Sequence, residues 1–329
     1  MSQNNTTTLY AGIDVAKATL QLSLGGRSHN IDNDARGHAR ILKLFTAAEK
    51  ARPGSKIHVI LEATGGYEAA LCGALHTAGR TLSVIQPSRA RHFAGAKSEH
   101  AKTDRIDADV LTAFGEAITP EPTPAPSAAQ SHLEHLVGRR AQLVETRTAE
   151  LNRAAHYSDK LLRAQSRRLL ALLGRQIAEC ERAIAAQIAA DETMAARAAR
   201  LQPFGPELMA EGQVPGVGAI VAATLQAHLP ELGSLSDGEA AGLAGLAPYN
   251  RDSGPWKGTR HIRGGRAPAR CALYMAALSA VRHDRILREF YTRLCEAGKK
   301  PLVALTAAMR KLVVLLNRML KKPAFTLAG

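Results

Sequence analysis

A chain of 329 residues, 46% of them hydrophobic, can bury a sizeable core and favours an organisation in two or three domains. It carries 43 lysine and arginine residues against 29 acidic ones, and the resulting net charge of +14 indicates nucleic acid or an anionic surface as a partner. Aromatic residues make up only 4% of the chain, so the composition argues against a general base-stacking platform for single strands.

The four cysteines are scattered and no Cys-x-x-Cys pair occurs, so the sequence indicates neither a zinc module nor a disulfide framework. Reduced thiols of a cytoplasmic protein are expected. Residues 1–6 lack the basic and apolar regions of a signal peptide, and no apolar run approaches the length of a membrane span. We therefore predict a cytoplasmic, nucleoid-associated protein without a membrane partner.

Residues 1–118 are predicted to form an α/β domain. The run 57–61 is apolar and almost continuous, as in a central strand buried on both faces, and Glu62 follows at its carboxyl end. Open α/β sheets bind ligands beyond the carboxyl ends of their strands, which directs attention to Glu62. The other expected elements are strands within 9–17, 18–32 and 81–85 and helices at 37–51, 68–78 and from 104 onward.

Four acidic residues of this region could share one site. Asp104 and Asp107 are three positions apart at the start of a helix that Thr103 can cap, so both lie on one face. Acids in a first turn often do no more than complement the helix dipole, and these two alone leave that reading open. With Asp14, inside the first predicted strand, and Glu62 they form the carboxylate set that Mg²⁺ prefers, and two such ions can promote phosphoryl transfer.

Residues 119–127 place a proline at nearly every second position, which predicts an extended linker between domains. Beyond it, apolar residues recur at helical spacing through 128–200, which favours two long antiparallel helices or a coiled-coil pair. The arginine-rich polar faces of this arm could serve dimerisation, face RNA or simply be solvated. Charge alone does not decide among these.

A second, mainly α-helical domain is predicted for 201–329. Gly216 and Gly218 precede a helix in a segment similar to the hairpin of a helix-hairpin-helix element, where glycine lets backbone amides approach phosphate. A plain tight turn before the helix explains the same two residues.

The stretch 249–270 is dense in glycine and arginine and is expected to neutralise phosphates. The expected nucleic-acid contacts are Arg251, Lys257, Arg260, Arg263, Arg266 and Arg270. Two hydroxyl groups, on Tyr249 and Ser253, could act as nucleophiles, but neither has an obvious base beside it in the sequence. The residues alone leave this choice open.

The motifs at 12–17, 62–65 and 102–108, in this order, resemble those of the DEDD transposases of bacterial insertion sequences. The resemblance implies an RNase-H-like domain of the RuvC type at 1–118, in which the metal ligands are Asp14, Glu62, Asp104 and Asp107. It also implies that Ser253 attacks DNA, that the arm serves assembly, and that a structured non-coding guide RNA, a bridge RNA, directs the choice of target and donor.

These expectations combine into one hypothesis: Mg²⁺-dependent strand cleavage and rejoining on target and donor DNA by a homo-oligomer, a dimer or a tetramer. The first alternative is a Holliday-junction-type endonuclease that hydrolyses DNA with metal-activated water, without a covalent intermediate. The second is a nucleic-acid-binding protein with a decayed nuclease core, against which the presence of all four acids argues.

Overall fold

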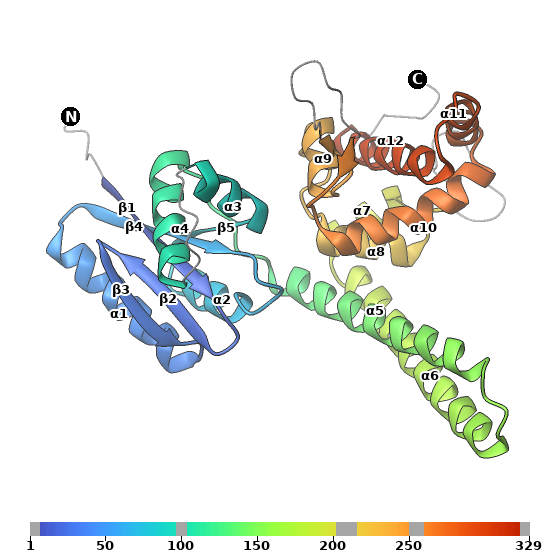
Figure 1. Ribbon diagram of the computed structural model, residues 1–329, viewed down its shortest axis with the longest axis horizontal. Coiled ribbons are helices and arrows are strands. Elements are labelled where there is room, and N and C mark those ends of the chain that lie inside the picture. Colours follow the sequence, from blue (N-terminus) through green and yellow to red (C-terminus); the bar gives the residue numbers. More distant parts are fainter. Residues whose placement is uncertain (1–6, 97–103, 202–215, 250–259, 323–329) are drawn as a thin grey trace. The chain divides into compact units, whose positions relative to one another are not determined.

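The computed structural model describes residues 7–96, 104–201, 216–249 and 260–322 (Figure 1). The chain divides into two compact units, Met1–Ala125 and Pro126–Gly329. The division falls inside the proline-rich stretch that the sequence marks as a linker.

The first unit is built on a five-stranded mixed sheet with the order β3-β2-β1-β4-β5. Strands β1 (Thr7–Val15), β2 (Thr19–Leu24) and β3 (Arg27–Asp32) form an antiparallel meander. Strand β4 (Ser55–Glu62) pairs in parallel with β1 and with β5 (Thr81–Ile85). Five consecutive residues of β4 are buried, as the sequence predicts for a central strand covered on both faces.

Helices cover both faces of this sheet. On one face, α1 (Ala35–Ala51) and α2 (Ala69–Thr77) pack into a core with the inward side chains of β1, β2 and β4. On the other face lie α3 (Pro87–Ala96) and α4 (Asp104–Ile118), whose residues cluster around Ile60. The predicted mixed α/β architecture of the N-terminal region is thus confirmed.

The proline-rich stretch lies along the edge strand β5. The amide of Thr123 donates to the carbonyl of Leu82 at 2.8 Å, and the Thr123 hydroxyl accepts from the amide of Val84 at 3.0 Å. The hydroxyl of Ser83 donates to the carbonyl of Glu121 at 2.7 Å. These bonds satisfy backbone groups at a sheet edge that would otherwise face solvent or another strand.

The second unit begins with a helical hairpin of α5 (Ala128–Ala154) and α6 (Lys160–Ala189) (Figure 1). The two helices are antiparallel, since His132 contacts Gln187 at one end and Arg140 pairs with Glu181 further along. Two antiparallel helices are therefore confirmed, while the coiled-coil reading of the arm stays a prediction.

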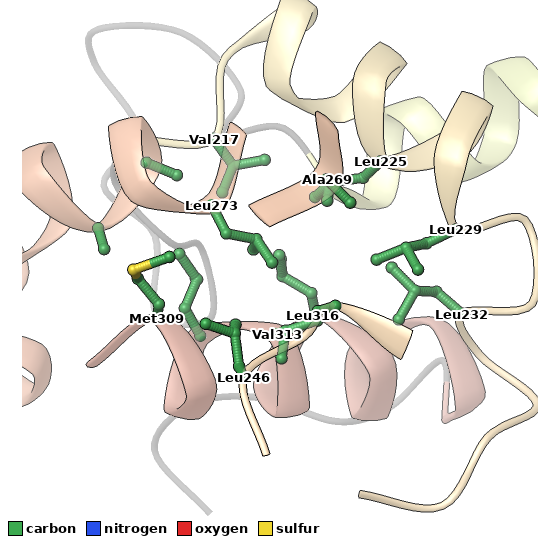
Figure 2. Packing of buried hydrophobic residues seen from close by; sticks show 14 of the residues in the cluster. Val217, Leu225, Leu229, Leu232, Leu246, Ala269, Leu273, Met309, Val313 and Leu316 are labelled. Carbon is green, nitrogen blue, oxygen red and sulfur yellow. The ribbon is translucent and has the colours of Figure 1, made fainter. Parts of the chain in front are cut away.

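The rest of this unit is mainly helical, as expected. Its helices are α7 (Glu192–Leu201), α8 (Ala219–His228), α9 (Asp237–Leu243), α10 (Ala267–His283), α11 (Arg285–Glu296) and α12 (Pro301–Lys321). Figure 2 shows their shared core, in which Val217, Leu273 and Leu316 pack among side chains from α8, α10 and α12. A two-stranded ribbon of β6 (Pro248–Tyr249) and β7 (His261–Ile262) completes the unit. Among the helices within the described ranges, none is long and apolar enough to cross a membrane.

Candidate active site

Asp14 lies on the face of β1 that meets helix α4. Ile13 and Val15 point into the core with α1, so Gly12 and Asp14, which alternate with them, take the opposite face. There is no room for a side chain at Gly12, because a methyl group would lie 2.6 Å from the amide nitrogen of Thr112 on α4. Helix and strand therefore touch backbone to backbone, two residues before Asp14.

The direction of α4 follows from a second close contact. A methyl group at Gly115 would lie 2.8 Å from the side chain of Ile60, which is paired with Gly12, and would also collide with the ring of Tyr10. The helix thus runs from Gly12 back toward Tyr10, antiparallel to β1. Its first turn, which holds Asp104 and Asp107, is at the end of the strand that carries Asp14.

Glu62 is next to Asp14 across the sheet. The parallel register pairs Gly12 with Ile60 and Ile13 with Leu61, so Glu62 follows at the level of Asp14. Ile60 packs against α4, and Glu62, two residues later, takes the same face. Asp14 and Glu62 therefore lie near the carboxyl ends of adjacent parallel strands, on the face that α4 covers.

This donor set suits a hard cation, since all four positions offer carboxylate oxygens. The side chain of Asp104 lies outside the described residues, and among those described no three His, Cys, Asp or Glu side chains form a group that could hold a metal ion. The strand register and the helix direction bring Asp14, Glu62 and the first turn of α4 to one end of the sheet. Their action as joint ligands stays a prediction.

One asparagine, which the sequence reasoning missed, ties the segments after both strand acids together. The Asn33 amide nitrogen donates to the carbonyl of Ala16 at 3.0 Å and to that of Tyr67 at 3.1 Å. Its amide oxygen is 2.9 Å from Nε2 of the buried His38, which must carry the proton in this contact. Ala16 follows Asp14 by two residues, and Tyr67 follows Glu62 by five. No local pattern in the sequence signals such a link.

The turn that follows Glu62 is closed by another carboxylate. One oxygen of Glu68 accepts from the amide and hydroxyl of Thr64, at 3.2 and 3.0 Å, and from the amide of Gly66 at 2.9 Å. Gly65 and Gly66 have φ angles of 74° and 107°, which side-chain-bearing residues rarely adopt. The Gly-Gly pair therefore gives the chain the tight turn that Glu68 then fixes.

In the second unit the predicted nucleophile lies outside the described residues. Ser253, Arg251 and Lys257 belong to the segment 250–259, which joins β6 to β7. The described residues on either side of that segment are paired, Pro248 with Ile262 and Tyr249 with His261.

The described arginines of the basic stretch differ in their surroundings. Arg260 and Arg263 are exposed, and Arg270 donates to the carbonyl of Gly264 at 2.7 Å. Arg266 instead forms a bidentate salt bridge with Glu231, in which both terminal nitrogens of the guanidinium donate to the carboxylate at 2.6 Å. It also donates to the carbonyl of His228. Arg266 therefore has a structural partner, whatever it also contributes to nucleic-acid binding.

The pair with Arg266 also lowers the pKa of the Glu231 carboxyl. Burial acts to raise the pKa of the carboxyl, but the hydrogen bonds and the charge of Arg266 outweigh it and hold the pKa below its usual range. The carboxylate is thus charged at neutral pH and anchors the start of α10.

Of the two glycines predicted to approach phosphate, Gly216 has a local reason for its identity. Its φ angle is 100°, and a methyl group there would lie 2.9 Å from Cβ of Ser279 on α10. Close packing on α10 therefore explains Gly216 without a phosphate. Gly218 caps α8 in open space, and its contact with phosphate stays a prediction.

Comparisons with known proteins bear on both units. Residues 11–161 match a family model of DEDD-type IS110 transposases, and residues 212–292 match one described as a transposase of the IS116/IS110/IS902 family. An uncharacterized 42 kDa protein of the insertion element IS900 from Mycobacterium paratuberculosis is 26% identical over 390 aligned positions, which cover 96% of each chain.

Among solved structures, RuvC of T. thermophilus, in complex with a Holliday junction substrate, aligns with 35% of this chain and 98% of its own. The identity is 16% and the TM-score 0.25, a likeness too distant to bear on function.

The two transposase models match separate parts of one chain. The first covers the unit with the four acids, and the second covers the segment with Ser253. The chain is accordingly a transposase, an enzyme that recombines DNA, and its two matched stretches are similar to insertion-sequence transposases of the IS110 type.

Proposed function

We propose that this transposase cleaves and rejoins DNA strands at a composite site, made of the acids of the first unit and Ser253 of the second. The observation that carries the proposal is the antiparallel packing of α4 on β1. This packing supports a position of Asp104 and Asp107 close to Asp14 and Glu62. The register of β1 and β4 supports a position of Asp14 beside Glu62.

In this scheme the four carboxylates would hold Mg²⁺, which when bound supplies polarisation of the scissile phosphate. The chain's own part is to bring negative oxygens together and to keep them in place. Asn33 and Glu68 serve this purpose, because they fix the turns behind Asp14 and Glu62. Four carboxylates brought together in this way would repel one another, so the proposed site would favour a bound cation.

Ser253 is the proposed nucleophile. Its hydroxyl oxygen attacks the scissile phosphorus and loses its proton, and the bond from phosphorus to the leaving DNA oxygen breaks as that oxygen is protonated. A hydroxyl of the second strand then displaces the serine, which restores the phosphodiester. Exposed Arg260 and Arg263 are suited to bind the phosphates on either side.

Target and donor DNA are the proposed substrates, and a structured non-coding RNA is the proposed guide. Support for the guide comes from the resemblance to the DEDD transposases and from a net charge of +14, which suits a second nucleic acid. The protein is proposed to act in the cytoplasm, at the nucleoid, as a homo-oligomer, a dimer or a tetramer, with the composite site formed within or between subunits.

The chemistry is tested with full-length protein and end-labelled donor and target DNA. Ser253→Ala should abolish both rejoining and the protein–DNA adduct that survives denaturation in detergent. The control is Ser234→Ala, because Ser234 is an exposed serine of the same unit. Cleavage that persists in Ser253→Ala without an adduct would instead support the endonuclease that hydrolyses DNA with water.

The guide is tested separately. The protein is purified from cells that carry its native flanking DNA, and co-purifying nucleic acid is sequenced. A discrete RNA from the flanks is expected, and its absence from active protein would rule the guide out.

A further inference from the structure

The second unit carries an apolar groove beside the β6–β7 ribbon. It has a volume of about 870 Å³ and is walled by the ribbon, by α10 and by the first half of α12. Large apolar side chains that line the groove are exposed to solvent: Met275 is 61% exposed, Leu302 65% and Val303 52%. Ile262 and Tyr274 are each 37% exposed at the same place. Apolar side chains gathered on one surface typically mark a binding site.

The charged side chains that line the groove are all positive. Arg260, Arg270, Lys299 and Arg310 line it, and none of its described lining residues is acidic. The carbonyl of Gly264 holds the Arg270 guanidinium in place. An occupant of this groove should therefore combine an apolar, flat part with negative charge.

We propose that the groove takes one unpaired nucleotide of the DNA strand being exchanged. The base would lie against Tyr274 and Met275, and its phosphates would meet the surrounding arginines and lysine. This inference rests on the proposed function, since it concerns the same strand that Ser253 is to attack. Aromatic residues are scarce in the chain as a whole, but one open ring beside apolar side chains is enough to stack a single base.

The place of the groove in the chain favours a DNA strand over a peptide. Its residues Arg260, His261 and Ile262 directly follow the segment that contains Ser253, and Pro248 precedes that segment. The groove is thus lined by residues that flank the segment of the proposed nucleophile on both sides in the sequence. Strand exchange also requires that bases near the cut leave their old partners, and proteins that extrude a base hold it in a pocket between aromatic or apolar side chains.

The groove contains its own chemical reporter, the free and exposed thiol of Cys271. Full-length protein is treated with N-ethylmaleimide alone, with a single-stranded dodecamer of thymidine, and with a duplex of the same length. Alkylation of each cysteine is followed by mass spectrometry, with Cys295 as internal reference. The single strand should slow alkylation of Cys271 at least fivefold relative to Cys295, and the duplex should have little effect.

Variants assign the effect to the groove. Tyr274→Ala should weaken binding of the single strand roughly tenfold, while Tyr274→Phe, which keeps the ring, should retain it. Arg310→Gln should lower the salt dependence of binding, whereas the control Arg285→Gln should not, because Arg285 is 85% exposed on α11 outside the groove. Circular dichroism verifies that each variant is folded.

Three outcomes would overturn the assignment. The first is unchanged alkylation of Cys271 with the single strand, and the second is protection by an RNA dodecamer but not by DNA. The third is alkylation that slows as the protein alone is concentrated, which would make the groove an interface between copies of the chain. Alkylation of Cys271 does not depend on catalysis, so the single strand should also slow it in Ser253→Ala protein. A failure of the serine mechanism would therefore leave this result unchanged and can be distinguished from a failure of the groove assignment.

Discussion

The hydroxyl of Thr112 on α4 accepts a hydrogen bond of 2.8 Å from the backbone amide of Gly12 on β1. The same hydroxyl lies 3.3 Å from the carbonyl of Ser23, the β2 residue paired with Gly12. A helix side chain thus takes part in the ladder between two strands, two residues before Asp14. This contact fixes the position of α4 on the strand that carries Asp14.

Replacement of Thr112 by valine is therefore expected to destabilise the protein. Valine keeps the shape but leaves the Gly12 amide without its acceptor, which costs about 1–3 kcal/mol. Urea unfolding measures the loss, and Thr112→Ser should recover most of it. If Thr112→Val unfolds like the wild type, the hydroxyl does not hold the helix in place.

The lack of space at Gly12 gives a second, independent prediction. Gly12→Ala should cost about 1–3 kcal/mol or more, because the added methyl group meets backbone rather than a movable side chain. The matched control is Gly73→Ala on α2, where nothing lies within 4 Å and alanine should be neutral or stabilising. Equal stability of the two variants would contradict the close contact of α4 with β1.

Part of this arrangement could be predicted from the sequence, since it depends on local pattern. The apolar run before Glu62 marks a central strand, and Asp14 interrupts another, so both acids are found without coordinates. The salt bridge between Arg266 and Glu231, 35 residues apart, could not be predicted, because in the sequence this arginine resembles its neighbours in a basic stretch. Nor could the docking of Thr123 on β5, since an alternating proline pattern specifies an extended chain but not what the chain lies against.

Removal of the strand acids should abolish strand cleavage with little loss of fold. Asp14→Asn and Glu62→Gln keep the size of each side chain but remove the charge that a cation requires, so activity should fall at least about a hundredfold. EDTA should have the same effect and added Mg²⁺ should reverse it. Asp109→Asn is the control, because Asp109 is an exposed acid on α4, the helix that also carries Asp104 and Asp107. Full cleavage by Asp14→Asn would remove the basis for the carboxylate site.

Asn33 should act through the turns that it joins. Asn33→Ala removes the bonds to Ala16 and Tyr67, so the two strand acids would be held less firmly and more Mg²⁺ would be needed for half-maximal cleavage. An increase of about tenfold is expected, as for other residues that orient metal ligands. The control Asn30→Ala changes an exposed asparagine of the neighbouring strand. A variant that loses only thermal stability, with its Mg²⁺ requirement unchanged, would assign Asn33 a purely structural role.

Stability should decline in mild acid because of two buried histidines, His38 and His58, and the half-buried His228. Burial lowers the pKa of His58, and it is also the main cause of the lowered pKa values of His38 and His228. The unfolded chain then binds more protons, so each contribution is complete above about pH 6.5 and is lost as the pH falls toward the folded pKa. Urea unfolding at several pH values should show a slope of up to about 1.4 kcal/mol per pH unit for each histidine. His58→Gln should flatten the curve, and His135→Gln, at an exposed position, should not.

Arg266 and Arg260 should separate stability from nucleic-acid binding. Arg266→Ala leaves Glu231 without its partner, and because both side chains are 38% exposed the expected cost is only about 1–2 kcal/mol. Arg260→Ala, at an exposed residue, should leave unfolding unchanged and reduce the salt dependence of DNA binding by about one phosphate contact. Denaturant unfolding and fluorescence anisotropy at several salt concentrations measure the two effects. Arg266→Ala could instead keep full stability and reduce the dependence of DNA binding on salt concentration. That result would mean that the guanidinium binds DNA and gives up its bond to Glu231 when DNA binds.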